Sequence, residues 1–156
     1  MEAQSDIEGW QTTRWGMTDS EIVSVVGIEK LGRIARAEYQ GLYADLEIPR
    51  IDVGRYEFKV IFQMNSETDK LTQVLVQHMP EDQRSEPKDA FNTAKKLLSE
   101  RFGAPERQGT SDTWLWRFPT TVIDLQYFYI EDIMSVVAVR YIPTARYEFP
   151  DVVSAF

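Results

Sequence analysis

A helix followed by three strands, within residues 87–142, is the unit that most constrains this chain. Apolar residues recur there at three- and four-residue spacing, which gathers them on one side of a helix. The stripe comprises Ala90, Phe91, Ala94, Leu97, Leu98 and Phe102. Pro87 suits a first helical turn, where Ser85 or Glu86 can cap, and Gly103 can adopt the left-handed conformation that ends a helix. The sequence therefore predicts a helix over residues 87–102.

Three extended runs follow this helix, at residues 113–118, 122–129 and 134–142. In each run, side chains alternate between two faces, as they do in a strand. The connections between the runs are short, so neighbouring strands must be antiparallel. We therefore predict a helix lying on an antiparallel meander.

The first of these runs predicts which side of its strand covers the helix. Trp114, Trp116 and Phe118 alternate along it and offer a large apolar area to the helix stripe. We predict that this side faces the helix and that Leu115 and Arg117 face away from it.

The first half of the chain has a similar order of elements. Thr18 and Glu21 have the spacing of a capping box, which predicts a helix over residues 18–26. Period-two runs follow at 42–48, 56–62 and 71–78, with turn residues at 49–54 between the first two. The predicted fold class is thus α+β, with helices packed on an antiparallel β-sheet.

Because the order of elements recurs, we expect a tandem repeat of helix-strand-strand-strand units, with halves at about residues 15–78 and 85–142. The alternative is one irregular α+β sheet with two helices. In either case residues 10–143 form a single domain. Residues 1–9 are polar and predict a flexible lead-in, whereas residues 144–156 are apolar enough to predict a packed tail.

Composition excludes several classes of function. The net charge of -8 would repel phosphate backbones, so we expect no nucleic-acid partner. No apolar run approaches the roughly 20 residues of a membrane span. Cysteine is absent, which excludes disulfides, thiolate nucleophiles and cysteine metal sites.

The residues that could carry catalysis are few. His78 is the only histidine, so it is the only imidazole base available to a catalytic triad, and a strand-end histidine is typically a surface or cap residue. Two clusters of polar residues are better explained as hairpin and turn residues than as metal ligands. One cluster is Asp124, Glu131 and Asp132, and the other is Asn65, Glu67 and Asp69. We predict no catalytic residue, metal or cofactor, and hence no enzyme.

Aromatic residues are concentrated in the second meander. A sheet with helices on one face must present its other face to solvent or to a partner. Tyr127, Tyr129 and Tyr141 are therefore candidate binding residues, since tyrosine is enriched at binding surfaces. The alternative is that these aromatic side chains form the core under the helix.

Several short motifs carry a resemblance to a known family. They are Trp15-Gly16-Met17-Thr18 with Glu21-Ile22, Phe102-Gly103-Ala104-Pro105, Trp114, Ile123-Asp124-Leu125 and Val139-Arg140-Tyr141. Together they resemble the BamE/SmpA-OmlA type of small bacterial envelope lipoprotein domain, in the duplicated arrangement of β-lactamase inhibitor protein (BLIP). The resemblance implies helices on an antiparallel sheet, a periplasmic or secreted location, and protein binding. The chain departs from that family in lacking a lipobox cysteine and in having one visible helix per half instead of two.

The sequence and the resemblance together favour a non-enzymatic protein-binding or scaffolding module of the bacterial cell envelope, with another protein as its partner. One alternative is an inhibitor-like protein that blocks the active site of another protein. A second is a small-molecule-binding or hydrolytic function in a cleft between the two halves.

Overall fold

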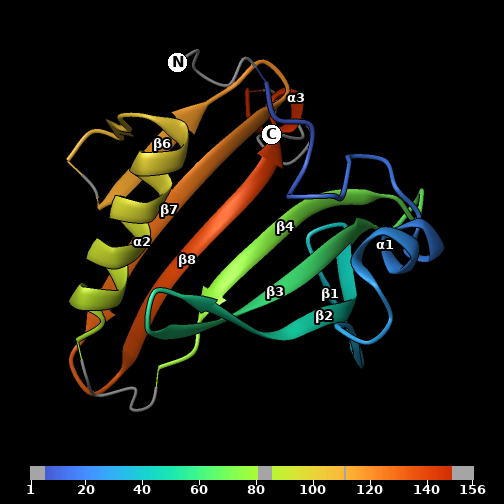
Figure 1. Ribbon diagram of the computed structural model, residues 1–156, viewed down its shortest axis with the longest axis horizontal. Helices are drawn as coiled ribbons and strands as arrows, with labels where there is room; N and C mark the ends of the chain where they lie inside the picture. The colour runs from blue at the N-terminus through green and yellow to red at the C-terminus, as the bar shows by residue number, and fades with distance from the viewer. Residues whose placement is uncertain (1–5, 81–85, 111, 149–156) are drawn as a thin grey trace.

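The structure, a computed structural model, describes residues 6–80, 86–110 and 112–148. These residues form one sheet of eight strands in the order β1-β2-β3-β4-β8-β7-β6-β5, with neighbouring strands antiparallel (Figure 1). The strands are β1 (Gly32–Tyr39), β2 (Leu42–Val53), β3 (Tyr56–Asn65), β4 (Leu71–His78), β5 (Glu106–Arg107), β6 (Thr113–Arg117), β7 (Thr121–Ile130) and β8 (Met134–Pro143). The helices are α1 (Asp19–Val26), α2 (Lys88–Phe102) and α3 (Thr144–Glu148).

The predicted fold class is wrong in its balance of helix and strand. Strands account for 48% and helices for 20%, so the molecule is mainly one sheet and not helices packed on a sheet. The repeat of helix-strand-strand-strand units is also wrong, because four strands follow α1 and four follow α2. The pattern of apolar residues missed β1, an edge strand without a buried face, and β5, which has two residues.

The predicted turn at residues 49–54 is also wrong, because β2 continues as far as Val53. The pairing of β2 with β3 shifts register between Ile48 and Ile51, which places Pro49 at an irregularity. A bulge of this kind tolerates proline, since no ladder hydrogen bond is required there. The longer hairpin extends the β2–β3 pair toward α2 (Figure 1).

Both predicted ends of α1 and the predicted C-terminal end of α2 are confirmed. The backbone N–H of Glu21 donates to the Thr18 hydroxyl at 3.4 Å, and the Thr18 N–H donates to the Glu21 carboxylate at 3.2 Å, so the capping box is formed. Ile22 is fully buried, and α1 lies beside the β1–β3 end of the sheet (Figure 1). At the end of α2, Gly103 has a positive φ of 95°, and its N–H donates to the Ser99 carbonyl. The predicted start of α2 is wrong in detail, because Pro87 is the N-cap and does not lie in the first turn, and no side chain caps the helix. Ser85, the other predicted cap, lies outside the described residues.

The core lies on the face of the sheet that carries α2. Two rows of directly paired residues cross this face from strand to strand. One row is Trp114, Leu125, Val139, Val76, Val60 and Ile48, and the other is Trp116, Ile123, Tyr141, Val74, Phe62 and Leu46. Eleven of these twelve side chains are buried, which makes the rows the centre of the core. Trp114 is half-buried, with the Lys95 ammonium of α2 lying 3.3 Å from its ring centroid.

The orientation predicted for the tryptophan strand is confirmed. The Trp116 indole donates to the Gly103 carbonyl, and the rings of Phe102 and Phe118 are 5.7 Å apart. Leu115 faces away from α2 and is nevertheless buried, at 2% exposure. The tryptophan side of β6 therefore covers the helix.

The N-terminal segment differs from the predicted flexible lead-in over residues 6–9. The Asp6 carboxylate accepts hydrogen bonds from the Thr120 N–H and hydroxyl at 2.8 and 2.7 Å. Ile7 is buried, and its carbonyl accepts a hydrogen bond from the Thr121 hydroxyl. Residues 1–5 lie outside the described residues, as do 149–156 of the predicted tail, and residues 144–148 form α3.

Candidate ligand-binding site

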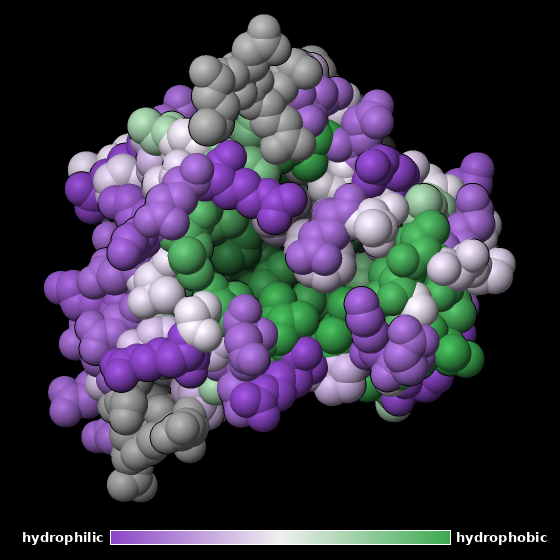
Figure 2. Space-filling view, in the orientation of Figure 1, coloured by the Kyte–Doolittle hydropathy of each residue, from purple (hydrophilic) through white to green (hydrophobic). Residues whose placement is uncertain are grey.

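A groove on the face of the sheet that carries α2 is the main candidate site. The groove runs between α2 and the β2–β3 hairpin, and Figure 2 shows it as a hollow lined by hydrophobic side chains. Its volume is about 220 Å³. The apolar side chains that line this groove are Ile51, Val53, Phe58, Val76, Ala94, Leu97, Leu98, Phe102 and Val139. We call this space the apolar groove.

The sheet and the β2–β3 hairpin form the floor and one end of the apolar groove. Val76 and Val139 pair across the β4–β8 junction and form its floor. The turn of the β2–β3 hairpin lies against α2, because a Cβ atom built on Gly54 would lie 2.9 Å from Thr93 Cγ2. Gly54 has a φ of 61°, a left-handed conformation that glycine adopts without strain. A tight turn therefore closes one end of the apolar groove.

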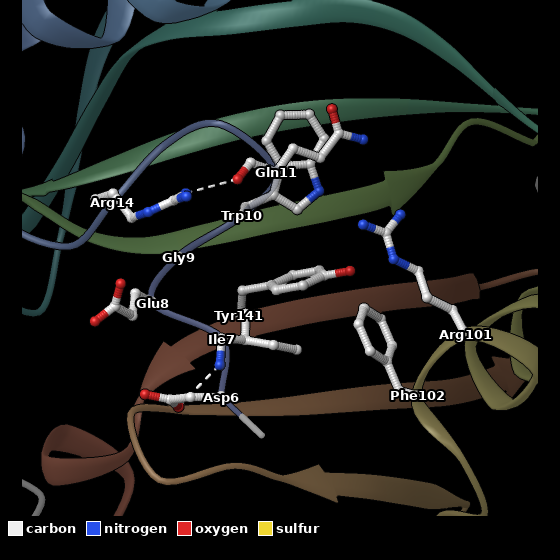
Figure 3. A pocket seen from close by; sticks show the side chains of 10 residues that line it. All are labelled: Asp6, Ile7, Glu8, Gly9, Trp10, Gln11, Arg14, Arg101, Phe102 and Tyr141. Atoms are coloured by element: carbon white, nitrogen blue, oxygen red, sulfur yellow. Dashed lines mark hydrogen bonds between the residues drawn. The ribbon is translucent and has the colours of Figure 1, made fainter. Parts of the chain in front are cut away.

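The other end of the groove opens into a more polar space of about 370 Å³ (Figure 3). Residues 6–11, Arg14, Arg101, Phe102 and Tyr141 line it, and five of its lining residues also line the apolar groove. These five are Trp10, Gln11, Arg101, Phe102 and Tyr141. The two spaces are thus continuous, and we call the second the polar end.

Three hydrogen-bond donors point into the polar end. Figure 3 shows the indole nitrogen of Trp10, the hydroxyl of Tyr141 and the guanidinium of Arg101 directed toward the same space. Trp10 and Tyr141 are only 5% and 8% exposed. Among the described residues, none of the three groups has a hydrogen-bonding partner, and all three residues border the open space of the polar end. The polar end can therefore donate hydrogen bonds from these three groups to a ligand.

Packing holds the Trp10 ring in place, and Tyr141 and Arg101 keep their protons at neutral pH. The Trp10 ring packs edge-on against Phe62, with centroids 6.0 Å apart. Burial raises the pKa of Tyr141 to about 12, an effect that the charge of Arg101 opposes. Tyr141 is therefore protonated at neutral pH and can donate. Arginine is always charged, so Arg101 presents a fixed positive charge to the polar end.

The neighbouring charged groups at the polar end are hydrogen-bonded elsewhere or directed away from Arg101. The Arg14 guanidinium donates to the carbonyls of Gln11 and Thr13 at 2.7 and 2.9 Å. The Asp6 carboxylate is held by Thr120, and these bonds lower its pKa. Glu8 points away from Arg101 in Figure 3. Arg101 is consequently the charge directed into the open space.

A second pocket, of about 530 Å³, contains His78 together with Glu57, Glu86 and Asp89. A histidine beside carboxylates can act in acid–base catalysis, so its geometry bears on an enzymatic function. The Glu57 carboxylate is 3.0 Å from the Arg50 guanidinium, and Glu86 accepts a 2.6 Å hydrogen bond from the Tyr127 hydroxyl. Two of the three carboxylates are thus directed to partners other than the imidazole.

The imidazole of His78 packs mainly against aromatic rings. Its centroid is 5.2 Å from that of Phe58 and 6.0 Å from that of Tyr56. Nδ1 is buried and has no hydrogen-bonding partner among the described residues, and burial lowers the pKa of the ring. A catalytic base is usually oriented by a hydrogen bond, and this nitrogen lacks one.

The three predicted tyrosines share one side of the sheet but occupy different places. Tyr141 lies at the polar end of the groove. Tyr127 packs on Phe91 of α2, with centroids 5.1 Å apart, and its hydroxyl is bonded to Glu86. Tyr129 lies two residues further along β7, toward the β7–β8 hairpin. The structure brings only Tyr141 of the three into the groove.

Sequence reasoning missed Trp10 and Arg101 as site residues. A signal for Arg101 is present, because residues 94, 98 and 101 follow helical spacing and place this arginine on the apolar face of α2. A charged residue on such a face is informative. The signal for Trp10 is weaker, since nothing near it in sequence indicates a pocket.

The acidic groups considered in the sequence lie apart from the groove. Asp124 is 1% exposed and forms a two-bond ion pair with Arg140, at 3.0 and 2.5 Å. Glu131 and Asp132 are exposed in the β7–β8 turn. Among the described residues, no group of three or more His, Asp or Glu side chains is placed to hold a metal ion. The helices of the described ranges are each too short or too polar to cross a membrane.

Comparisons with protein-family models, with curated proteins and with solved structures gave no match to this chain.

Proposed function

We propose that this protein is a non-enzymatic binding protein whose apolar groove takes up the hydrocarbon part of a small molecule. The observation that carries the proposal is the continuity of a recessed apolar groove with a space lined by a few converging donors. Small-molecule sites are typically concave and mainly apolar, with a small number of polar groups that orient the ligand.

The chemistry of the polar end supports binding over catalysis. Arginine, tryptophan and a tyrosine of raised pKa all keep their protons at neutral pH, so these groups donate hydrogen bonds and do not remove protons. His78, the one residue with a suitable ordinary pKa, lies in the second pocket, and the Gly54 turn meets α2 between that pocket and the apolar groove.

The test is a titration with an uncharged apolar fluorophore, N-phenyl-1-naphthylamine. Val53 and Leu97 line the groove and are partly exposed, so the double variant Val53→Gln/Leu97→Gln makes the walls polar without replacing a fully buried side chain. We expect it to bind the fluorophore at least about tenfold more weakly than the wild type. A tenfold change corresponds to a loss of about 1.4 kcal/mol of binding free energy, which is in the range expected for the loss of one buried apolar side chain. The matched control is Ile28→Gln/Ile133→Gln, at residues that are 75% and 70% exposed and outside the groove. Equal binding by all three proteins would contradict the proposal.

A second candidate function is protein binding in the bacterial envelope. It is favoured by one exposed apolar patch at the tip of the β7–β8 hairpin, formed by Phe128, Ile130, Ile133 and Met134, which are 41–70% exposed. Contiguous exposed apolar residues are typical of protein interaction sites. If this function is correct, a periplasmic protein retained by the wild type will not be retained by Phe128→Ser/Ile133→Ser. The same protein should still be retained by Val53→Gln/Leu97→Gln.

A further inference from the structure

We infer that the groove binds an alkyl carboxylate, with the carboxylate held at the polar end by Arg101, Tyr141 and Trp10 and the alkyl chain in the apolar groove. This inference rests on the proposed function and adds the chemical class of the ligand.

The number and type of donors match a carboxylate. The guanidinium offers a planar pair of N–H groups, and the Tyr141 hydroxyl and Trp10 indole each offer one more. A carboxylate accepts through two oxygens with about four lone-pair positions, so it can engage all three groups at once. Hydrogen bonds between charged partners are about twice as strong as neutral ones.

The sign of the ligand charge follows from the electrostatics. Arg101 makes no ion pair within the described ranges. Asp6 is bonded to Thr120, Glu8 is directed away from Arg101, and Asp52, which also lines the apolar groove, is ion-paired with Arg50 at 3.5 Å. A cationic head group would therefore face an unopposed guanidinium. The protein as a whole has a net charge of -8, which disfavours non-specific binding of anions, so an anion that binds must do so through a local site.

The groove suits a hydrocarbon chain better than a peptide. Its floor is the junction of β4 with β8, whose backbone groups are bonded to each other across the pairs Val74–Tyr141 and Val76–Val139. The walls are mainly apolar side chains from α2 and the β2–β3 hairpin. A peptide would bury backbone N–H and C=O groups there without partners, which is costly, whereas an alkyl chain has none to satisfy.

The experiment compares decanoate, 1-decanol and decylamine by isothermal titration calorimetry. Wild-type protein should bind decanoate at least about tenfold more tightly than 1-decanol, and decylamine most weakly. Arg101→Met removes the charge but keeps an unbranched side chain on an exposed part of α2, and it should abolish the preference for decanoate. Tyr141→Phe should reduce this preference by several-fold. Lys96→Met, which removes a positive charge from an exposed position of the same helix, is the matched control and should behave as wild type.

The results separate the two proposals. If wild type binds decanoate and 1-decanol equally and Arg101→Met changes neither affinity, the assignment of the carboxylate is overturned while the apolar groove remains a binding site. Tighter binding of decylamine than of decanoate would also overturn it. If none of the three compounds binds and N-phenyl-1-naphthylamine does not bind either, the proposed function fails together with this inference.

Discussion

The indole nitrogen of Trp116 donates a 2.7 Å hydrogen bond to the carbonyl oxygen of Gly103, the residue at which α2 ends. Carbonyls at a helix C-terminus lack partners within the helix, so this bond satisfies one of them. The same side chain is 3% exposed and forms part of the core row that crosses the sheet. One residue of β6 thus fixes the end of the helix that forms a wall of the groove.

Replacing Trp116 should therefore reduce stability strongly. We expect Trp116→Ala to lower the free energy of unfolding by about 3–5 kcal/mol, as is usual for a large core side chain. Trp116→Phe keeps most of the packing and should cost less, mainly the loss of a hydrogen bond worth about 1 kcal/mol. Chemical denaturation measures both, and an unchanged midpoint for Trp116→Ala would refute the assignment of this residue to the core.

The pair formed by Asp124 and Arg140 should be sensitive to removal of its positive partner. Asp124 is buried, and Arg140→Met would leave its carboxylate without a counter-charge. We expect this variant to lose about 3–5 kcal/mol at neutral pH. The double variant Asp124→Asn/Arg140→Met removes both charges and should be more stable than Arg140→Met alone in the same denaturation experiment.

The cost of Arg140→Met should also depend on pH. Burial raises the pKa of Asp124 in the folded protein, while Arg140 opposes that rise. Without Arg140 the folded-state pKa rises further, so the folded variant takes up a proton at a higher pH than the unfolded chain does. Its stability then increases as the pH falls toward the ordinary pKa of 3.8. A cost that is equal at pH 7 and at about pH 4 would contradict this account.

His78 should make the protein less stable in mild acid. Burial lowers its pKa in the folded state below the ordinary 6.5, so the unfolded chain binds the proton more readily. The stability due to the neutral ring is present above pH 6.5 and is lost as the pH falls from there through the folded-state pKa.

We expect the melting temperature to fall between about pH 7.5 and about pH 5.5. The variant His78→Phe retains an aromatic ring beside Phe58 and should show a nearly flat profile over this range, since the chain has one histidine. Equal slopes in the two proteins would show that His78 does not cause the effect.

Local signals in the sequence predicted the elements whose chemistry is local. The capping box at Thr18 and the terminating Gly103 defined helix ends because each acts within one turn. The side of β6 that covers α2 was also predictable, since Trp114 and Trp116 outweigh anything on the opposite side in apolar area.

Features that depend on distant partners were not predictable in this way. The edge strand β1 is formed by pairing with β2 and buries little of its own surface, so no period-two pattern marks it. The strand through Pro49 depends on a register shift against β3. The joining of β4 to β8 brings residues 74–77 beside residues 138–141, and no local pattern encodes that pairing.

The candidate site illustrates the same limit. Tyr141 was identified by residue type alone, and its role depends on Trp10 and Arg101, which lie on two other segments. The groove exists because the β2–β3 hairpin reaches α2, a contact between residues about forty positions apart in sequence, Gly54 and Thr93. Helical spacing was sufficient to place Arg101 on the apolar face of α2, but it could not show what that face would meet.

The contact between Gly54 and Thr93 should be essential for closing the groove. Gly54→Ala adds a methyl group that would lie 2.9 Å from Thr93 Cγ2, and it also places a side chain at a φ of 61°. The left-handed backbone conformation of an alanine at this position should alone lower the free energy of unfolding by about 1–2 kcal/mol. The collision should add to this cost or push the hairpin away from α2.

A second glycine, Gly41, allows the cost of backbone strain to be separated from the cost of the collision with Thr93. Gly41 has a φ of 81°, and a Cβ atom built there meets nothing within 4 Å, so Gly41→Ala carries only a backbone cost. We expect Gly54→Ala to be the more destabilising variant in chemical denaturation. Adding Thr93→Ser, which removes the Cγ2 methyl group, should recover most of the difference between them. If Gly54→Ala and Gly41→Ala lose equal stability and Thr93→Ser restores none of it, the hairpin does not press on α2, and another contact must close that end of the groove.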